Sequence, residues 1–137
     1  MSKIQYYDFK PADRILTPKS LFGLIQHHAV YLGPNYQGQD LIAENAFGKY
    51  VRMMTAEEFF REYPTVTRID RSQGSEYEMT EAIERALRLL NEPYSLIDFN
   101  CEHYVNLVQF NKRESKQIGG AFLLILLFVA VFVAREN

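Results

Sequence analysis

The residues of this chain best suited to chemistry are its single cysteine, Cys101, and its three histidines, His27, His28 and His103. A thiol that has lost its proton is a strong nucleophile, and cysteine catalysis needs a base that takes this proton. A third polar group normally holds the base in the correct tautomer and orientation. A cysteine with a histidine elsewhere in the chain is therefore the pattern of a thiol enzyme, although a lone cysteine is otherwise most often a small buried apolar residue.

The residues around Cys101 predict that it lies in the first turn of a helix. Asn100 is a good N-cap, because its side-chain oxygen can accept a hydrogen bond from a free amide group at a helix start. Apolar residues such as Tyr104 and Val108 follow at helical spacing, and we expect the helix to run to about Phe110. The free amide groups and the dipole of a helix start favour an anion, which lowers the pKa of a thiol placed there.

The three histidines are not equally placed to serve as the base. His103 is two positions after Cys101 on the same expected helix, and at about 100° per residue the two side chains point about 200° apart. We therefore expect His103 to have a structural role. His27 and His28 are adjacent on an expected strand and point to opposite faces, so only one of them can face the cysteine. The residue pattern alone does not choose between these two.

The rest of the chain predicts a small antiparallel sheet packed on helices, which is an α+β fold. Short runs of strand-forming residues, separated by turns and loops, predict strands at 14–16, 22–32, 41–45, 50–53 and 66–69. A short helix is expected over 56–61 with Thr55 as its N-cap, and residues 71–78 are expected to form a loop. The clearest apolar stripe predicts a helix from Glu81 to Leu90 with Thr80 as its N-cap.

The end of the chain is expected to be a membrane anchor. Residues 118–134 form an uncharged, mostly aliphatic run of about 17 residues, at the short end of a membrane span. A buried core helix is the alternative, but the run has no polar face. Three basic residues lie in segment 112–117 and one, Arg135, follows the run, which favours a domain on the cytoplasmic side. The expected organisation is a catalytic domain over 1–111, a basic linker over 112–117 and a transmembrane tail anchor over 118–134.

Composition argues against several classes of function. The net charge is -2 and the isoelectric point is near 5.9, so the chain lacks the basic surface typical of nucleic-acid binding. One cysteine and three histidines without short spacing do not predict a tetrahedral metal site, and no glycine-rich phosphate loop is present. The first residues lack the apolar core of a secretory signal. We therefore expect no nucleic-acid partner, no metal and no cofactor.

Four segments resemble one enzyme family. Residues 100–106 (NCEHYVN) closely resemble the N-C-E-H-F-V-N signature of the lecithin:retinol acyltransferase family, which includes the H-Ras-like suppressor phospholipase/acyltransferases. Residues 27–33 (HHAVYLG) are similar to the family strand H-[WY]-[AG]-[IV]-Y-[VLI]-G, and residues 10–13 (KPAD) to its K-P-G-D. Residues 93–97 (PYSLI) are similar to the family's lead into the cysteine. The resemblance implies a circularly permuted papain-like fold of the NlpC/P60 group.

The same resemblance implies roles for single residues. Cys101 is implied as the nucleophile and His27 as the general base, whereas His28 occupies the family's aromatic position and is expected to pack. The family usually has a second histidine at the end of the next strand, and this chain has none there. Glu44 falls at the matching place, and its carboxylate could accept the His27 N–H. Asn45 is the alternative orienting residue, although it would point to the other face of a regular strand.

The implied function is a membrane-anchored thiol acyltransferase or phospholipase that acts on a phospholipid ester and has the bilayer as its partner. His27 would deprotonate Cys101, the thiolate would attack the ester carbonyl, and a thioester acyl-enzyme would pass its acyl group to water, an amine or an alcohol. One alternative is a thiol peptidase or amidase of the NlpC/P60 kind. Another is a non-catalytic, membrane-tethered interaction module, which the missing second histidine favours.

Overall fold

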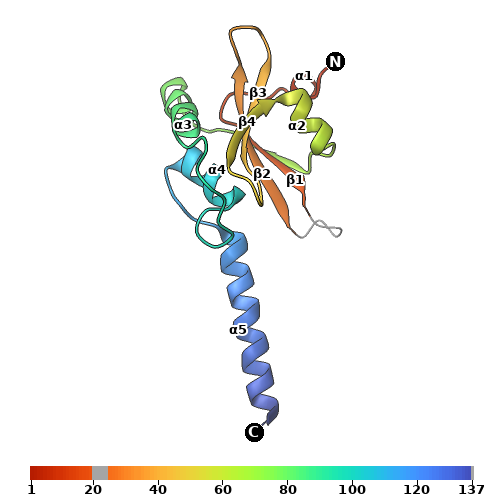
Figure 1. The fold of residues 1–137 in the computed structure, drawn as a ribbon, viewed down its shortest axis with the longest axis vertical. Helices are drawn as coiled ribbons and strands as arrows, with labels where there is room; N and C mark the ends of the chain where they lie inside the picture. The colour runs from red at the N-terminus through yellow and green to blue at the C-terminus, as the bar shows by residue number, and fades with distance from the viewer. Residues whose placement is uncertain (20–24, 137) are drawn as a thin grey trace.

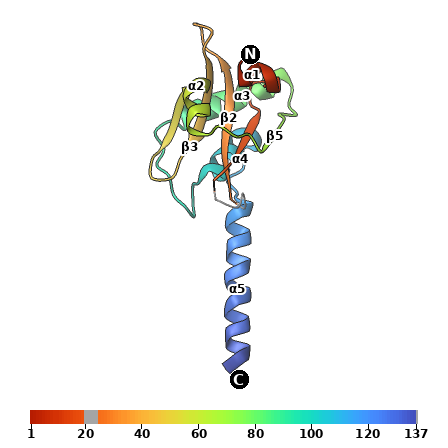
Figure 2. The same cartoon turned by 90° about the vertical axis from the view of Figure 1, so that its right-hand side faces the viewer.

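A computed structural model of the protein describes residues 1–19 and 25–136. The described chain forms one antiparallel sheet with short helices against it, and a long C-terminal helix projects from one end of this domain (Figures 1 and 2). The helices are α1 (Lys3–Tyr7), α2 (Ala56–Glu62), α3 (Glu76–Arg88), α4 (Cys101–Phe110) and α5 (Lys116–Glu136). The strands are β1 (Arg14–Pro18), β2 (Gln26–Pro34), β3 (Asp40–Asn45), β4 (Val51–Thr55) and β5 (Arg68–Asp70).

The sheet brings three polar residues to one face. Its strand order is β4-β3-β2-β1-β5, with every pair antiparallel and β2 in the centre. In the β2–β3 and β3–β4 registers Ala29 lies opposite Glu44, and Glu44 lies opposite Arg52. Because residues two apart on a strand point to the same face, His27 shares the face of Ala29. His27, Glu44 and Arg52 therefore lie on the same side of the sheet, at neighbouring positions.

Two apolar clusters hold the helices to the sheet. One joins α3 and α4 to it through residues that include Val30, Ala43 and Tyr104, and the other joins α1 and α2 to it through residues that include Ile42 and Phe59. Full burial of one such large apolar side chain contributes roughly 1.5–3 kcal/mol to folding. The helix that carries Cys101 is thereby packed against β2 and β3, and α2, which precedes Tyr63, is packed against β3 and β4.

Most of the predicted elements are confirmed with small shifts of boundary. The structure bears out the predicted strands at 14–16, 41–45 and 50–53, and the helices at 56–61 and 101–110. The strand predicted at 22–32 begins at Gln26, and its residues 22–24 lie outside the described part of the chain. The strand predicted at 66–69 is shorter, and helix α1 lies in a segment for which no element was predicted.

The predicted start of the third helix is wrong by about one turn. Helix α3 begins at Glu76 rather than Glu81, so the end of the predicted loop is helical. Ser75 is the N-cap, and it forms a reciprocal capping box with Glu78 that satisfies two backbone amide groups of the first turn. Thr80 lies inside the helix, where its hydroxyl donates to the carbonyl of Glu76 at 2.9 Å.

The predicted transmembrane tail anchor is also wrong. Within residues 1–19 and 25–136, no helix is long and apolar enough to cross a membrane. Helix α5 has 21 residues, but it starts at Lys116 and ends at Glu136. The uncharged run inside it is about 17 residues, against about 20 that a typical span needs. This corrects both the transmembrane helix in the predicted fold and the predicted single-pass anchor with its domain on the cytoplasmic side.

Candidate active site

Cys101 is the first residue of α4, as its sequence context predicts. The side-chain oxygen of Asn100 accepts hydrogen bonds from the backbone N–H groups of Glu102, at 2.9 Å, and His103, at 3.1 Å. Cys101 is a free thiol and is 3% exposed. The helix start is thus anchored by its own cap, and the thiol lies where the helix dipole favours a negative charge.

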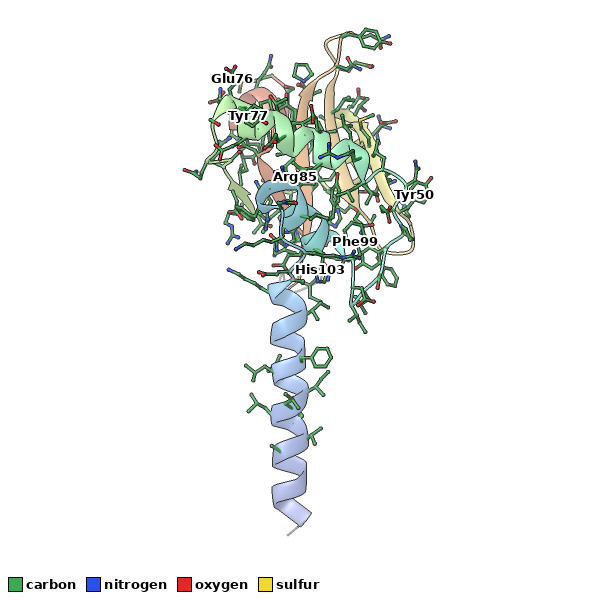
Figure 3. All side chains as sticks on the ribbon, turned by 90° about the vertical axis from the view of Figure 1, so that its left-hand side faces the viewer. Tyr50, Glu76, Tyr77, Arg85, Phe99 and His103 are labelled. Carbon is green, nitrogen blue, oxygen red and sulfur yellow. The ribbon has the colours of Figure 1, made fainter. Side chains whose placement is uncertain are left out.

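His103, the histidine nearest to Cys101 in sequence, serves the helix start rather than the thiol. Its Nδ1 accepts a hydrogen bond from the backbone N–H of Asn100 at 3.2 Å, which completes the capping box of α4. Burial lowers the pKa of its imidazole, so that the ring stays neutral and able to accept. Figure 3 shows His103 at the end of the domain from which α5 leaves.

His27 is the histidine that the structure brings to Cys101. Its ring is 1% exposed, its Nε2 lies 2.5 Å from Oε2 of Glu44, and it is close enough to the Cys101 thiol for each group to shift the pKa of the other. Because Nε2 is engaged with Glu44, Nδ1 is the ring nitrogen that remains for the sulfur. The ring of Tyr63, just after α2, stacks on the imidazole with centroids 4.7 Å apart and planes at 21°. Three neighbours therefore fix the orientation of this ring.

The charges at the site favour a thiolate–imidazolium pair. Burial alone lowers the pKa of His27, but its hydrogen bonds to Cys101 and Glu44 outweigh burial and raise this pKa to about 9. Burial raises the pKa of Cys101, but the hydrogen bond and charge of His27 outweigh it and lower this pKa below its usual value. The backbone N–H of His28 and the ammonium group of Lys19 act in the same direction on the thiol. Both shifts favour transfer of the thiol proton to the imidazole.

The carboxylate of Glu44 lies behind His27 and is fully buried. Burial raises the pKa of Glu44, but hydrogen bonds from His27 and Arg52 outweigh it, so that the carboxylate keeps its charge. Asn45, the alternative orienting residue, turns to the other side of the strand, where its Nδ2 donates to the carbonyl of Phe99 at 2.7 Å. Of the two residues weighed from the sequence, Glu44 is the one that the fold places beside His27.

His28 lies on the opposite face of β2 from His27. Its Nδ1 is 3.4 Å from Nη1 of Arg14, and its side chain is 5% exposed. Burial and the charge of Arg14 lower the pKa of His28 to about 4, which leaves the ring neutral. Of the two adjacent histidines, His27 is the one beside Cys101, and His28 packs against Arg14 on the other face.

Two residues of the site were not anticipated from the sequence. Arg52 donates from Nε to Oε1 of Glu44 at 2.7 Å, and Tyr63 stacks on His27. Side chains alternate between the two faces of β4, so a known strand register would have placed Arg52 on the face of Glu44. Local sequence patterns do not determine that register. No comparable signal marks Tyr63, which follows the last residue of α2 and precedes a proline.

Aromatic rings and a lysine lie near the thiol, and exposed aliphatic side chains lie in the loop before its helix. The rings of Phe47 and Tyr94 meet edge to face with centroids 5.5 Å apart, and Nζ of Lys19 lies 5.8 Å and 5.6 Å from their centroids. Burial and the negative charge of Cys101 raise the pKa of Tyr94 to about 12, which ties this ring to the thiol. Leu96 and Ile97, in the loop that leads into α4, are 57% and 59% exposed.

Comparison with known proteins agrees with this geometry. The family model described as lecithin retinol acyltransferase matches residues 7–114, a segment that contains Cys101, His27 and Glu44. No curated protein matches the chain. The match covers the sheet and α2 to α4, and it ends before α5. This chain therefore belongs to the lecithin retinol acyltransferase family.

Proposed function

We propose that the protein is a thiol acyltransferase or phospholipase in which Cys101 attacks the ester carbonyl of a phospholipid. The observation that carries this proposal is the buried series of contacts from Cys101 to His27 and from His27 to Glu44. Members of the family to which the chain belongs are typically acyltransferases and phospholipases, which supports an enzyme of this general class. The finer assignment rests on the chemistry of the site.

In the first half-reaction, the sulfur of Cys101 bonds to the ester carbonyl carbon and forms a tetrahedral intermediate. The imidazolium of His27 then gives its proton to the departing alcohol oxygen of the lysophospholipid as the carbon–oxygen bond breaks. A thioester between Cys101 and the fatty acyl group remains. The N-terminus of α4 stabilises the negative charge that develops on the carbonyl oxygen, because its amide dipoles point toward that charge.

In the second half-reaction, neutral His27 takes a proton from water, an amine or an alcohol, and the resulting nucleophile attacks the thioester carbonyl. The carbon–sulfur bond breaks and the Cys101 thiolate is restored. Glu44 holds the Nε2–H tautomer of His27 in both halves and stabilises the imidazolium when it forms. Two half-reactions of this kind give ping-pong kinetics.

The surroundings of the thiol support an acyl ester as the substrate. Phe47 is 67% exposed beside Tyr94, and Leu96 and Ile97 are exposed in the loop before α4. Apolar side chains of this kind suit an acyl chain, whereas a peptidase needs polar groups that hold a peptide backbone. The ammonium group of Lys19, above the rings of Phe47 and Tyr94, supplies a cation for the phosphate of a phospholipid.

The proposal is tested with the full-length protein and phosphatidylcholine labelled in its acyl chains, presented in mixed detergent micelles. We expect release of labelled fatty acid or its transfer to an added amine, complete loss of both in Cys101→Ala, and unchanged turnover in Tyr36→Ala. Tyr36 is a suitable control because it is 94% exposed in the loop between β2 and β3.

Two results would overturn the proposal. Hydrolysis of peptide or simple amide substrates in place of the ester would assign the protein to the peptidase class. If protein that is folded by circular dichroism turns over none of these substrates, the result would instead support a non-catalytic interaction module.

A further inference from the structure

We propose that Arg52 is a positioning residue of the active site, which, together with Glu62, holds the buried Glu44 carboxylate ionised and aimed at His27. The expected effect of Arg52 on turnover rests on the proposed function, whereas its expected effect on the reactivity of the Cys101 thiol does not. It concerns a residue that touches neither the thiol nor the imidazole, and that acts only through Glu44.

The two carboxylate oxygens of Glu44 have different partners, His27 and Arg52. Oε2 of Glu44 faces Nε2 of His27 at 2.5 Å, and Oε1 accepts from Nε of Arg52 at 2.7 Å. Nη2 of Arg52 also contacts Oε1 of Glu44 and donates to Oε2 of Glu62 at 2.8 Å. Each carboxylate oxygen of Glu44 therefore has a cationic partner of its own, and a rotation that improves one contact breaks the other.

Glu62 holds the outer end of the same guanidinium group. It is the last residue of α2, and its other oxygen, Oε1, lies 3.7 Å from Nζ of Lys49. The next residue along the chain is Tyr63, whose ring stacks on His27. Two residues at this end of the helix therefore support the site. Glu62 holds Arg52, which contacts the carboxylate of Glu44, and Tyr63 stacks directly on the imidazole of His27.

The catalytic cycle gives Arg52 its importance. Glu44 is fully buried, and a carboxylate without a cation in such a place tends to take up a proton. While His27 is an imidazolium, Glu44 has two cationic neighbours. When His27 has given its proton to the leaving alcohol, Arg52 remains to keep Glu44 charged. An ionised Glu44 is then ready to stabilise the imidazolium that forms again in the second half-reaction.

The charged and titratable groups around Glu44 alternate in sign along the contacts described. Starting from the thiol, they are the anion of Cys101, the cation of His27, the anion of Glu44, the cation of Arg52, the anion of Glu62 and the cation of Lys49. Tyr63 also faces this group, and its pKa is raised by burial and by the charges of Glu44 and Glu62, so it stays neutral. Removal of Arg52 leaves two carboxylates facing each other, which raises the pKa of Glu44.

The test compares Arg52→Gln, Glu44→Gln and the double variant in the full-length protein, with Arg61→Gln as the matched control. Arg61 forms an exposed ion pair with Glu57 at 3.0 Å in the same region of the molecule. For Arg52→Gln we expect kcat/KM to fall by about 10- to 100-fold, mainly through kcat, as for other residues that orient a functional side chain. The acid limb of its pH profile should move to higher pH, and Arg52→Lys should restore part of the activity.

The coupling between positions 44 and 52 separates this role from a general loss of stability. If Arg52 acts through the charge of Glu44, Arg52→Gln should cost less than about twofold when Glu44→Gln is already present. Equal losses in both backgrounds would overturn the proposal, as would a wild-type pH profile in Arg52→Gln. Should Arg52→Gln fail to fold, the milder Arg52→Lys and Glu62→Gln variants give the same comparison, and urea unfolding reports their stability.

A second readout does not depend on lipid turnover. The rate at which iodoacetamide alkylates Cys101 reports the thiolate that His27 and Glu44 maintain. In Arg52→Gln the acid limb of this rate should move to higher pH, whereas Arg61→Gln should match the wild type. If the acid limb of alkylation shifts in Arg52→Gln but the wild-type protein does not turn over lipid, the proposed function is contradicted and the role of Arg52 is supported. Alkylation that is unchanged in Arg52→Gln would overturn that role alone.

Discussion

The side chains of His27 and Glu44 approach within 2.5 Å of each other although the two residues are 17 positions apart. The antiparallel register of β2 and β3 produces this approach, because Ala29 lies opposite Glu44 and His27 is the diagonal neighbour on the same face. Both side chains are withdrawn from solvent. A buried carboxylate therefore occupies the place beside the candidate base where the resemblance to the family leads one to expect a second histidine.

Replacement of Glu44 by glutamine keeps a side chain of similar shape and removes its charge. We expect kcat/KM to fall by about 10²- to 10⁴-fold, since the amide can present its NH₂ group to the ring and so stabilise the wrong tautomer of His27. The fall should appear in kcat rather than in KM. The pKa of His27, followed by the NMR signals of its ring in the wild type and the variant, should decrease because a neighbouring anion is lost. A wild-type kcat in a folded variant would contradict the role of Glu44.

The reactivity of the thiol should depend on His27 and not on His103. The imidazolium of His27 lowers the pKa of Cys101, so iodoacetamide should react rapidly at a pH well below the usual thiol value of 9.0. In His27→Ala the two largest causes that lower this pKa are lost while burial, which raises it, remains. The rate at pH 7 should then fall by about tenfold or more, as expected for a rise of one unit or more. His103→Gln should keep the wild-type rate. A rate that follows His103 instead would refute the assignment of the base.

The dependence of stability on pH follows from the same groups. The pKa of Glu44 is lower in the folded protein than its ordinary value of 4.5, so its stabilising effect is present above that pH and is lost as the pH falls through the folded value. The raised pKa of His27 adds stability that is present below pH 6.5 and is lost as the pH rises to about 9. The lowered pKa of Cys101 acts in the opposite direction, since its stabilising effect is present above pH 9.0 and is lost as the pH falls. Urea unfolding should show a loss of stability in acid that is smaller in Glu44→Gln.

The start of α3 offers a test of the fold away from the active site. Ser75→Ala removes the cap and should reduce the free energy of unfolding by about 1 kcal/mol. Thr80→Ala should have an effect within about 0.5 kcal/mol or be slightly stabilising, since alanine is the better helix former inside a helix. Thermal or urea unfolding of the two variants distinguishes them, and a larger loss for Thr80→Ala would contradict the helix start.

The features that the sequence predicted correctly are those set by neighbouring residues. Asn100 caps the helix of Cys101 because the hydrogen bonds involved span only two or three positions. The alternation of β3 separates Glu44 from Asn45 for an equally local reason. Arg52 and Tyr63 were missed because their partners are reached through strand pairing and through the packing of α2, which local patterns do not encode.

Two predictions failed, one for the start of α3 and one for the C-terminal apolar run. Ser75 and Thr80 are both acceptable N-caps, and the reciprocal bond of Ser75 with Glu78 favours the earlier start. The apolar run over 118–134 suggested an anchor by its composition, although its length is below that of a typical span. In each case a further quantity, the position of a capping partner or the length of a run, decided the outcome.

Capture of the acyl-enzyme tests the proposed reaction of Cys101 most directly. Full-length protein is mixed with phosphatidylcholine in micelles, quenched in acid within the first turnovers and measured by intact-protein mass spectrometry. If Cys101 is the nucleophile, the protein should gain the mass of one fatty acyl group that maps to Cys101, is released by hydroxylamine and is absent from Cys101→Ala. An adduct that persists in Cys101→Ala, or the formation of product by wild-type protein that never carries an acyl group, would contradict this role of Cys101.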